Sequence, residues 1–165
     1  MSQRPFAAYS GDEPFVFVSY AHADSARVYP LLLEQRERGV QFWYAEGIEP
    51  GSTWRDELAS AIDRCDRVLF LASERSVASK NCLKELNFAL ARDKRIIVAN
   101  LETVALPDAL ELSLGDEQAV HAEHYDAATF ADKLHRALTG DGQGQFQARG
   151  RASAPHPARN RVLAP

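Results

Sequence analysis

Short apolar runs alternate with amphipathic stretches over most of the chain. Four of these runs are rich in β-branched and aromatic residues and have the length of buried strands: residues 15–20, 40–44, 68–72 and 96–100. A fifth, shorter strand is predicted over residues 118–121. The run at 68–72 is apolar at almost every position, which is typical of a strand covered on both faces in a parallel sheet.

The stretches between the runs repeat apolar residues at helical spacing. Asp24 is predicted to cap one helix, which ends at Gly39, and Thr53 to cap a second. Two further helices are predicted over about residues 80–92 and 129–138. Helices that alternate with strands indicate crossover connections and a parallel sheet.

Three segments break this regularity. Pro30 is tolerated in a first helical turn but not in a helix interior, so the helix after Asp24 is expected to begin late or irregularly. Residues 73–79 predict a Ser-rich loop. Residues 101–117 show no clear pattern, because Pro107 and Gly115 interrupt them.

The predicted fold class is α/β: a flavodoxin-like three-layer fold with a five-stranded parallel sheet of order 2-1-3-4-5, flanked by helices. The folded domain is expected over residues 13–139. Residues 1–12 are expected to be disordered. Residues 140–165 hold four Arg and one Asp with few aliphatic side chains, which predicts a disordered linker or tail.

Composition narrows the function classes. The chain has 165 residues, 45% of them hydrophobic, and a formal net charge of −4, which argues against a nucleic-acid binder. No stretch reaches the length of a membrane span, and the N-terminus lacks the apolar core of a secretion signal. Cys65 and Cys82 show no zinc-binding spacing and are interpreted as reduced thiols of a cytoplasmic protein. No metal site is expected.

The predicted topology selects a region for chemistry. Ligands of such sheets bind beyond the carboxyl ends of the strands, here near the switch point between the first and third strands. The loops after the first three strands, residues 19–24, 44–53 and 73–81, meet at this edge. Glu85 lies in the second turn of the helix predicted from about Lys80, whose N-terminus favours a negative charge, so an ionised carboxylate is expected there.

Three segments, in this order, resemble TIR (Toll/interleukin-1 receptor) domains in their bacterial form. Phe15-Val-Phe-Val-Ser-Tyr-Ala resembles the first strand of these domains. Residues 42–54, Phe-Trp-Tyr-Ala-Glu-Gly-Ile-Glu-Pro-Gly-Ser-Thr-Trp, resemble their second strand and BB loop. Leu71-Ala-Ser with residues 79–86, Ser-Lys-Asn-Cys-Leu-Lys-Glu-Leu, resembles their third strand and the following helix.

The resemblance implies an enzyme that hydrolyses NAD+ or cyclises its ADP-ribose part, in bacterial immunity or signalling. NAD+ is then the substrate, and no cofactor is expected. In enzymatic members the carboxylate of the C-x-x-E-L segment is essential, and here that residue is Glu85. The family also suggests the residues that contact the substrate, which are Ser19, Tyr20, His22, Phe42, Trp43, Tyr44, Asn81 and Cys82.

The same resemblance leaves a second function open, a non-catalytic assembly domain. The BB loop would then dock onto other TIR domains in a homo-oligomer or filament, through Glu46, Gly47, Ile48, Glu49, Pro50 and Gly51. In the enzymatic interpretation, assembly is expected to activate the site, under a sensor or regulatory module in cis or in trans. Two positions depart from the family pattern: Asn81 replaces a frequent Trp, and Ala45 replaces a frequent Asp.

A response-regulator receiver domain shares the predicted fold but needs different residues. It requires an acidic pair after the first strand and an acceptor Asp at the end of the third. This chain has Ser19-Tyr20 and Ala72-Ser73 at those places, which excludes this class. A Gly-rich phosphate-binding turn is also missing after the first strand.

Overall fold

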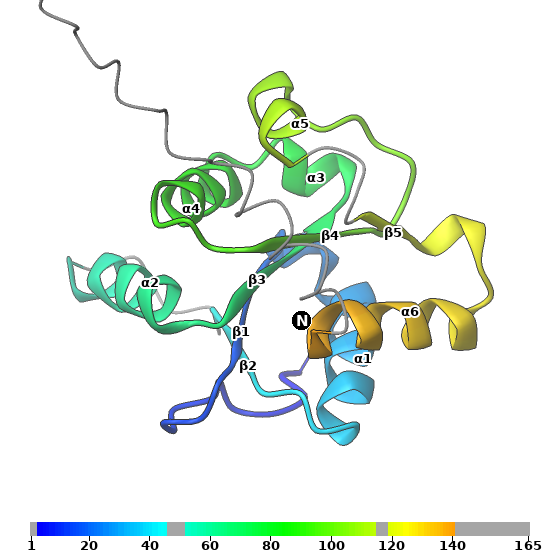
Figure 1. Ribbon diagram of the computed structural model, residues 1–165, viewed down its shortest axis with the longest axis horizontal. Helices are drawn as coiled ribbons and strands as arrows, with labels where there is room; N and C mark the ends of the chain where they lie inside the picture. Colours follow the sequence, from blue (N-terminus) through cyan, green and yellow to red (C-terminus); the bar gives the residue numbers. More distant parts are fainter. Residues whose placement is uncertain (1–2, 46–51, 115–118, 141–165) are drawn as a thin grey trace, which may run out of the picture.

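A computed structural model describes residues 3–45, 52–114 and 119–140. Its centre is a parallel sheet of order β2-β1-β3-β4-β5, which confirms the predicted flavodoxin-like fold (Figure 1). All four strand pairs are parallel. The strands are β1 (Val16–Ser19), β2 (Phe42–Tyr44), β3 (Arg67–Ala72), β4 (Ile96–Asn100) and β5 (Ala119–His121).

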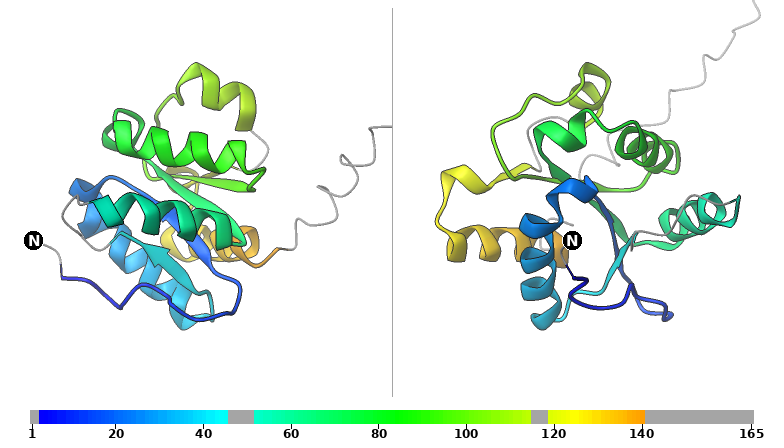
Figure 2. Two further views of the ribbon diagram at one scale, coloured as in Figure 1. Left: turned by 90° about the vertical axis from the view of Figure 1, so that its left-hand side faces the viewer. Right: turned by 180° about the vertical axis from the view of Figure 1, so that it is seen from behind.

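Helices cover both faces of the sheet (Figures 1 and 2). One face is covered by α1 (Ser25–Glu37) and α6 (Ala127–Thr139), and we call it the α1 face. The opposite face, here the α4 face, carries α2 (Ser52–Arg64), α3 (Glu74–Val77), α4 (Lys80–Ala91) and α5 (Asp108–Leu114). Single 3-10 turns, η1 (His22–Asp24) and η3 (Ala122–His124), follow β1 and β5.

Side chains alternate between the two faces along each strand, so the core has two halves. On β1, Val16 and Val18 pack with α1 and α6, whereas Phe17 packs on the α4 face. On β3, Leu71 and Phe70 occupy opposite halves and both are fully buried. This confirms that the third strand is covered on both sides.

The two N-terminal helices begin differently from their predicted caps. Helix α1 starts at Ser25 and contains Pro30 in its interior, where the proline ring is exposed, so the predicted late start is wrong. Asp24 precedes α1, but its side chain makes no capping hydrogen bond. Helix α2 begins at Ser52, so Thr53 lies inside the helix rather than at its cap.

Two short helices occupy segments without a helical prediction. Helix α3 replaces part of the expected Ser-rich loop, because Ser73 and Ser76 form a reciprocal capping box. Helix α5 follows Pro107, whose carbonyl accepts hydrogen bonds from the backbone N–H of Leu110 and Glu111. Proline has no backbone N–H to donate, but its carbonyl can accept hydrogen bonds, so Pro107 can precede the first turn of α5.

The N-terminal segment lies along β2, the edge strand of the sheet (Figure 2). The backbone N–H of Tyr9 donates to the carbonyl of Phe42 at 2.8 Å. Phe6 stacks on Phe42, and the Arg36 guanidinium lies 4.7 Å from the centre of the Phe6 ring. Phe6 and Tyr9 thus pack against the domain, although the composition predicted disorder for residues 1–12. The expected tail after Gly140 lies outside the described residues.

Candidate functional site

Ser19 and Glu85 form the centre of the candidate site. Ser19 is the last residue of β1 and is completely buried. Because it follows Phe17 by two positions, it points to the α4 face. Its hydroxyl donates a hydrogen bond to Oε2 of Glu85 at 2.7 Å. The predicted carboxylate therefore lies at the carboxyl edge of the sheet, at the switch point between β1 and β3.

Helix α4 holds Glu85 from its second turn. Ser79 caps this helix, and its hydroxyl accepts a hydrogen bond from the backbone N–H of Cys82 at 3.3 Å. Leu86 and Ala89 anchor the same helix in the core. Glu85 is thus carried by a packed helix rather than by a loop.

Burial raises the pKa of Glu85 from 4.5 to about 7, while the hydrogen bond from Ser19 acts in the opposite direction. The sequence led us to expect that the helix N-terminus would keep this carboxylate ionised. The pKa moves the other way, because the loss of hydration outweighs the stabilisation of the charged form. Glu85 therefore exchanges its proton near neutral pH.

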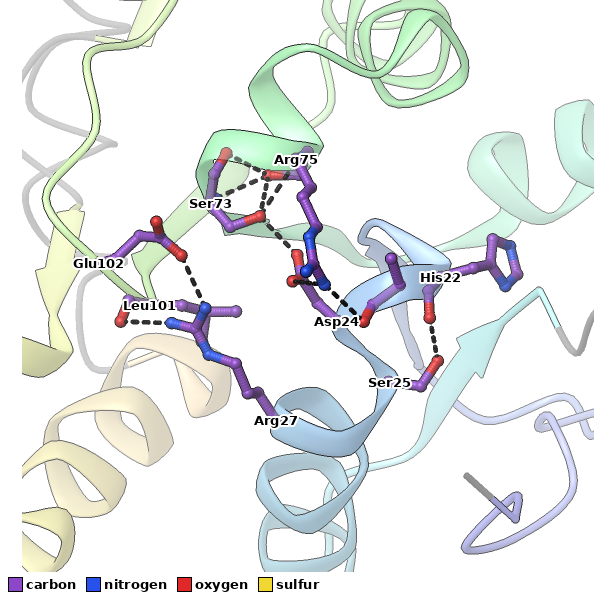
Figure 3. Close-up of polar contacts among 10 residues, drawn as sticks. His22, Asp24, Ser25, Arg27, Ser73, Arg75, Leu101 and Glu102 are labelled. Carbon is purple, nitrogen blue, oxygen red and sulfur yellow. Dashed lines mark hydrogen bonds and ion pairs between the residues drawn. The ribbon is translucent and has the colours of Figure 1, made fainter. Parts of the chain in front are cut away.

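Cys82 lies one turn before Glu85 on α4, and Asp24 lies in η1, which follows β1 at the same edge of the sheet. Cys82 is 2% exposed, and burial raises its pKa, with further increases from the charges of Glu85 and Asp24. The thiol is accordingly protonated rather than a reactive thiolate. Asp24 is also buried, and one carboxylate oxygen accepts a hydrogen bond from Oγ of Ser73 at 2.5 Å (Figure 3). This contact explains why Asp24 does not cap α1.

The aromatic residues of β2 separate to the two faces. Trp43 pairs with Phe17 in the register and stacks on it, with ring centres 5.1 Å apart, on the α4 face. Phe42 and Tyr44 point to the α1 face, where both are buried in the opposite half of the core. The structure therefore places Trp43 on the side of Glu85, but the sheet separates Phe42 and Tyr44 from it.

Tyr20 holds the end of β2. Its hydroxyl donates to the carbonyl of Ala45 at 3.0 Å, and burial raises its pKa, so it stays protonated. This contact anchors the backbone at Ala45, directly after β2. His22 has its ring centre 5.2 Å from that of Tyr20, and partial burial lowers its pKa, although much of the residue is exposed.

Asn81, the second residue of α4, is exposed. The BB-loop residues Glu46 to Gly51 lie outside the described residues. Asp24 and Ser73 were not among the predicted site residues. Asp24 lies in the segment between β1 and α1, and Ser73 directly follows β3; these positions at the switch point were the available signal.

Comparison with known proteins identifies the family. The TIR domain family model matches residues 16–138. The chain belongs to the TIR domain family. A comparison of this TIR domain with curated proteins finds no match.

Solved structures share the fold at low sequence identity. The TIR domain of the Toll-related receptor TRR-2 from Hydra magnipapillata is 20% identical, with a TM-score of 0.63 over 75% of this chain and 97% of that one. The CMP N-glycosidase BcmB of Clostridium botulinum is 19% identical, with a TM-score of 0.53 over 72% and 96%. One chain in the structure of the RPS4 and RRS1 TIR domain heterodimer is 14% identical, with a TM-score of 0.56 over 77% of this chain and 96% of that one.

A pocket of this TIR domain lies at the other edge of the sheet. Residues 11–15 and 64–66 line it, at the amino ends of β1 and β3, so it is remote from Glu85. Among the residues with described positions, no three His, Cys, Asp or Glu side chains are grouped as a metal site requires. No helix in the described ranges is long and apolar enough to cross a bilayer.

The raised pKa of Glu85 predicts a pH-dependent loss of stability. Between the ordinary pKa of 4.5 and the folded-state pKa of about 7, the folded protein binds more protons than the unfolded chain. The free energy of unfolding must therefore fall as the pH rises through this window. We expect the wild type to lose stability relative to Glu85→Gln between pH 5 and pH 8, measured by urea unfolding at each pH.

Ser19→Ala supplies the companion measurement. The hydrogen bond from Ser19 lowers the pKa of Glu85, so its loss should raise that pKa further. The decline in the free energy of unfolding should then extend to higher pH than in the wild type. Parallel stability curves for the wild type and Glu85→Gln would contradict the raised pKa.

Proposed function

We propose that this TIR domain cleaves the nicotinamide–ribose bond of NAD+, as a glycohydrolase or cyclase in bacterial immunity or signalling, and is activated by self-assembly. The proposal depends on one observation: a half-buried carboxyl group, Glu85, is held by Ser19 at the switch point of a parallel sheet. Crevices at such switch points bind ligands in open α/β sheets.

The chemistry requires a positioned carboxylate. Cleavage of the bond gives the ribose oxocarbenium character, and a nearby anion stabilises that developing charge. Ionised Glu85 supplies the anion and accepts hydrogen bonds from ribose hydroxyls. Nicotinamide leaves as a neutral molecule, so the bond breaks without a metal ion or a strong acid.

The pKa of Glu85 suits the second half of the reaction. With a pKa of about 7, the carboxylate is present at neutral pH and is basic enough to accept a proton from the attacking nucleophile. Water as that nucleophile gives ADP-ribose, whereas a hydroxyl or ring nitrogen of the bound ADP-ribose gives a cyclic product. The Clostridium botulinum N-glycosidase supports the proposal by analogy, because it shares this fold.

The test measures nicotinamide release from NAD+ at increasing protein concentration, with chromatographic analysis of the products. We expect the rate per protein molecule to rise with concentration, since assembly is proposed to complete the site. ADP-ribose as the product indicates hydrolysis, and a cyclic isomer indicates cyclisation. No release from an assembled sample, with or without a regulatory module, would contradict NAD+ cleavage.

Assembly without catalysis is the second candidate function. The heterodimer formed by the RPS4 and RRS1 TIR domains favours it, since the shared fold serves there in TIR–TIR association. In this case the chain self-associates, as sedimentation velocity would detect, and releases no nicotinamide. Substitutions at Glu85 would then leave the association unchanged.

A further inference from the structure

The guanidinium of Arg75 lies at the same sheet edge as the candidate site and makes contacts through only one of its nitrogens among the described residues. Arg75 is the second residue of α3, directly beyond the carboxyl end of β3, and its side chain is 63% exposed. Nη1 donates to the carbonyl of Ala23 at 2.9 Å and lies 3.6 Å from Oδ1 of Asp24. Figure 3 shows the side chain reaching from α3 to η1. Nε and Nη2 of Arg75 contact no acceptor among the residues that the structure describes.

A buried carboxylate fixes this guanidinium. Asp24 is 3% exposed and is itself held by Ser73, so it cannot move freely with Arg75. A guanidinium carries five N–H donors in a rigid fork, and one anchored nitrogen leaves the others oriented toward solvent. Such a fork suits the oxygens of a phosphate group.

Arg75 and Glu85 lie at the same edge of the sheet, beyond two neighbouring strands. Arg75 follows β3 in α3, and Glu85 is hydrogen-bonded to Ser19 at the end of β1, the strand that pairs with β3. Helices α3 and α4 also contact each other directly. A ligand whose ribose is held by Glu85 would therefore extend toward α3.

We propose that Arg75 binds the phosphate attached to the ribose that Glu85 holds, so that the site selects phosphorylated nucleotides over nucleosides. This inference rests on the proposed function, and it adds a substrate-binding residue and a substrate class. NAD+ carries a diphosphate on the 5′ carbon of the same ribose whose other side bears nicotinamide. One cation at the same sheet edge as the carboxylate can thus hold the charged end while Glu85 holds the hydroxyls.

Arg75 also bridges α3 and η1, so a purely structural role is the competing interpretation. The two roles differ in substrate dependence. Loss of a structural bridge weakens every substrate equally, whereas loss of a phosphate ligand weakens only substrates that carry phosphate. Nicotinamide riboside, which lacks the diphosphate but keeps the same scissile bond, separates them.

The kinetic test compares NAD+ with nicotinamide riboside for the wild type and Arg75→Gln. We expect kcat/KM for NAD+ to fall about 10–100-fold, mainly through KM, as for loss of a hydrogen bond to a charged group. The value for nicotinamide riboside should not change. An equal loss for both substrates, or no loss for either, would overturn the inference.

Arg27→Gln is the matched control. Arg27 lies at the same edge, but both of its terminal nitrogens are already used, by Glu102 at 2.6 Å and by the carbonyl of Leu101 at 2.8 Å (Figure 3). This variant removes the same charge from a guanidinium whose two terminal nitrogens already have partners. It should therefore keep the wild-type kcat/KM for NAD+ within about twofold.

A binding measurement separates this inference from the proposed function. Titration calorimetry with ADP-ribose reads the phosphate contact without turnover. Weaker binding by Arg75→Gln than by Arg27→Gln would support the phosphate contact even if NAD+ were never cleaved. NAD+ cleavage with equal ADP-ribose binding by both variants would overturn the contact and leave the proposed function intact. No binding by the wild type would also overturn it.

Discussion

Replacing Glu85 with Gln is expected to reduce nicotinamide release from NAD+ by at least on the order of 10²-fold. The amide has the size of the carboxyl group and can still accept the hydrogen bond from Ser19, so the fold should be retained. It has no negative charge to stabilise an oxocarbenium ion and cannot accept a proton. The measurement is steady-state release at the protein concentration that gives the highest wild-type rate.

Glu111→Gln controls for the loss of one negative charge. Glu111 is exposed on α5 and lies outside the predicted site. Its substitution should leave the rate within about twofold of the wild type, as for surface changes away from a site. Turnover by Glu85→Gln equal to that of Glu111→Gln would remove Glu85 from the mechanism. Circular dichroism of both variants verifies that they are folded.

The strands were predictable because their apolar runs directly indicate burial. Residues 68–72 are apolar at successive positions, which requires cover on both faces, and the structure buries β3 between two helical layers. Strands separated by helical stretches also limit the topology to a few parallel orders. The strand order alone predicts that Glu85 lies at the carboxyl edge of the sheet.

The division of the site by the sheet also follows from the alternation of residues along β2. Phe42 and Tyr44 are two positions apart and must share a face, and Trp43 must take the other. The register of β1 with β2 then decides which face meets α4, and Phe17 pairs with Trp43. Family resemblance grouped these three residues, whereas strand geometry separates them.

Other features depend on contacts that no local pattern reveals. The pKa of Glu85 is raised by burial, and the extent of burial is set by the packing of β1 against α4. Asp24 has the sequence signature of a helix cap, yet Ser73, 49 positions away, binds its carboxylate. Pro30 stays within α1 because the helix around it is fixed by tertiary packing of Val28 and Leu32.

The largest expected effect on stability comes from Leu71→Ala in β3. Leu71 is completely buried in the α1 half of the core, in the central strand between β1 and β4. Truncation removes buried methyl groups and leaves a cavity that packed neighbours fill only in part. The cost for such a change is about 2–5 kcal/mol, against a total stability of about 5–15 kcal/mol for a domain. Urea unfolding should show a lower midpoint with an unchanged slope.

Leu112→Ala is the same chemical change at a site without burial. Leu112 lies on α5 and is 90% exposed. Its truncation therefore loses little buried apolar surface and opens no cavity. Alanine also favours helix at least as well as leucine, so the free energy of unfolding should stay within about 0.5 kcal/mol of the wild type. The pair isolates burial from residue type. Equal losses for the two variants would mean that the sheet is not covered on the α1 face as the structure has it.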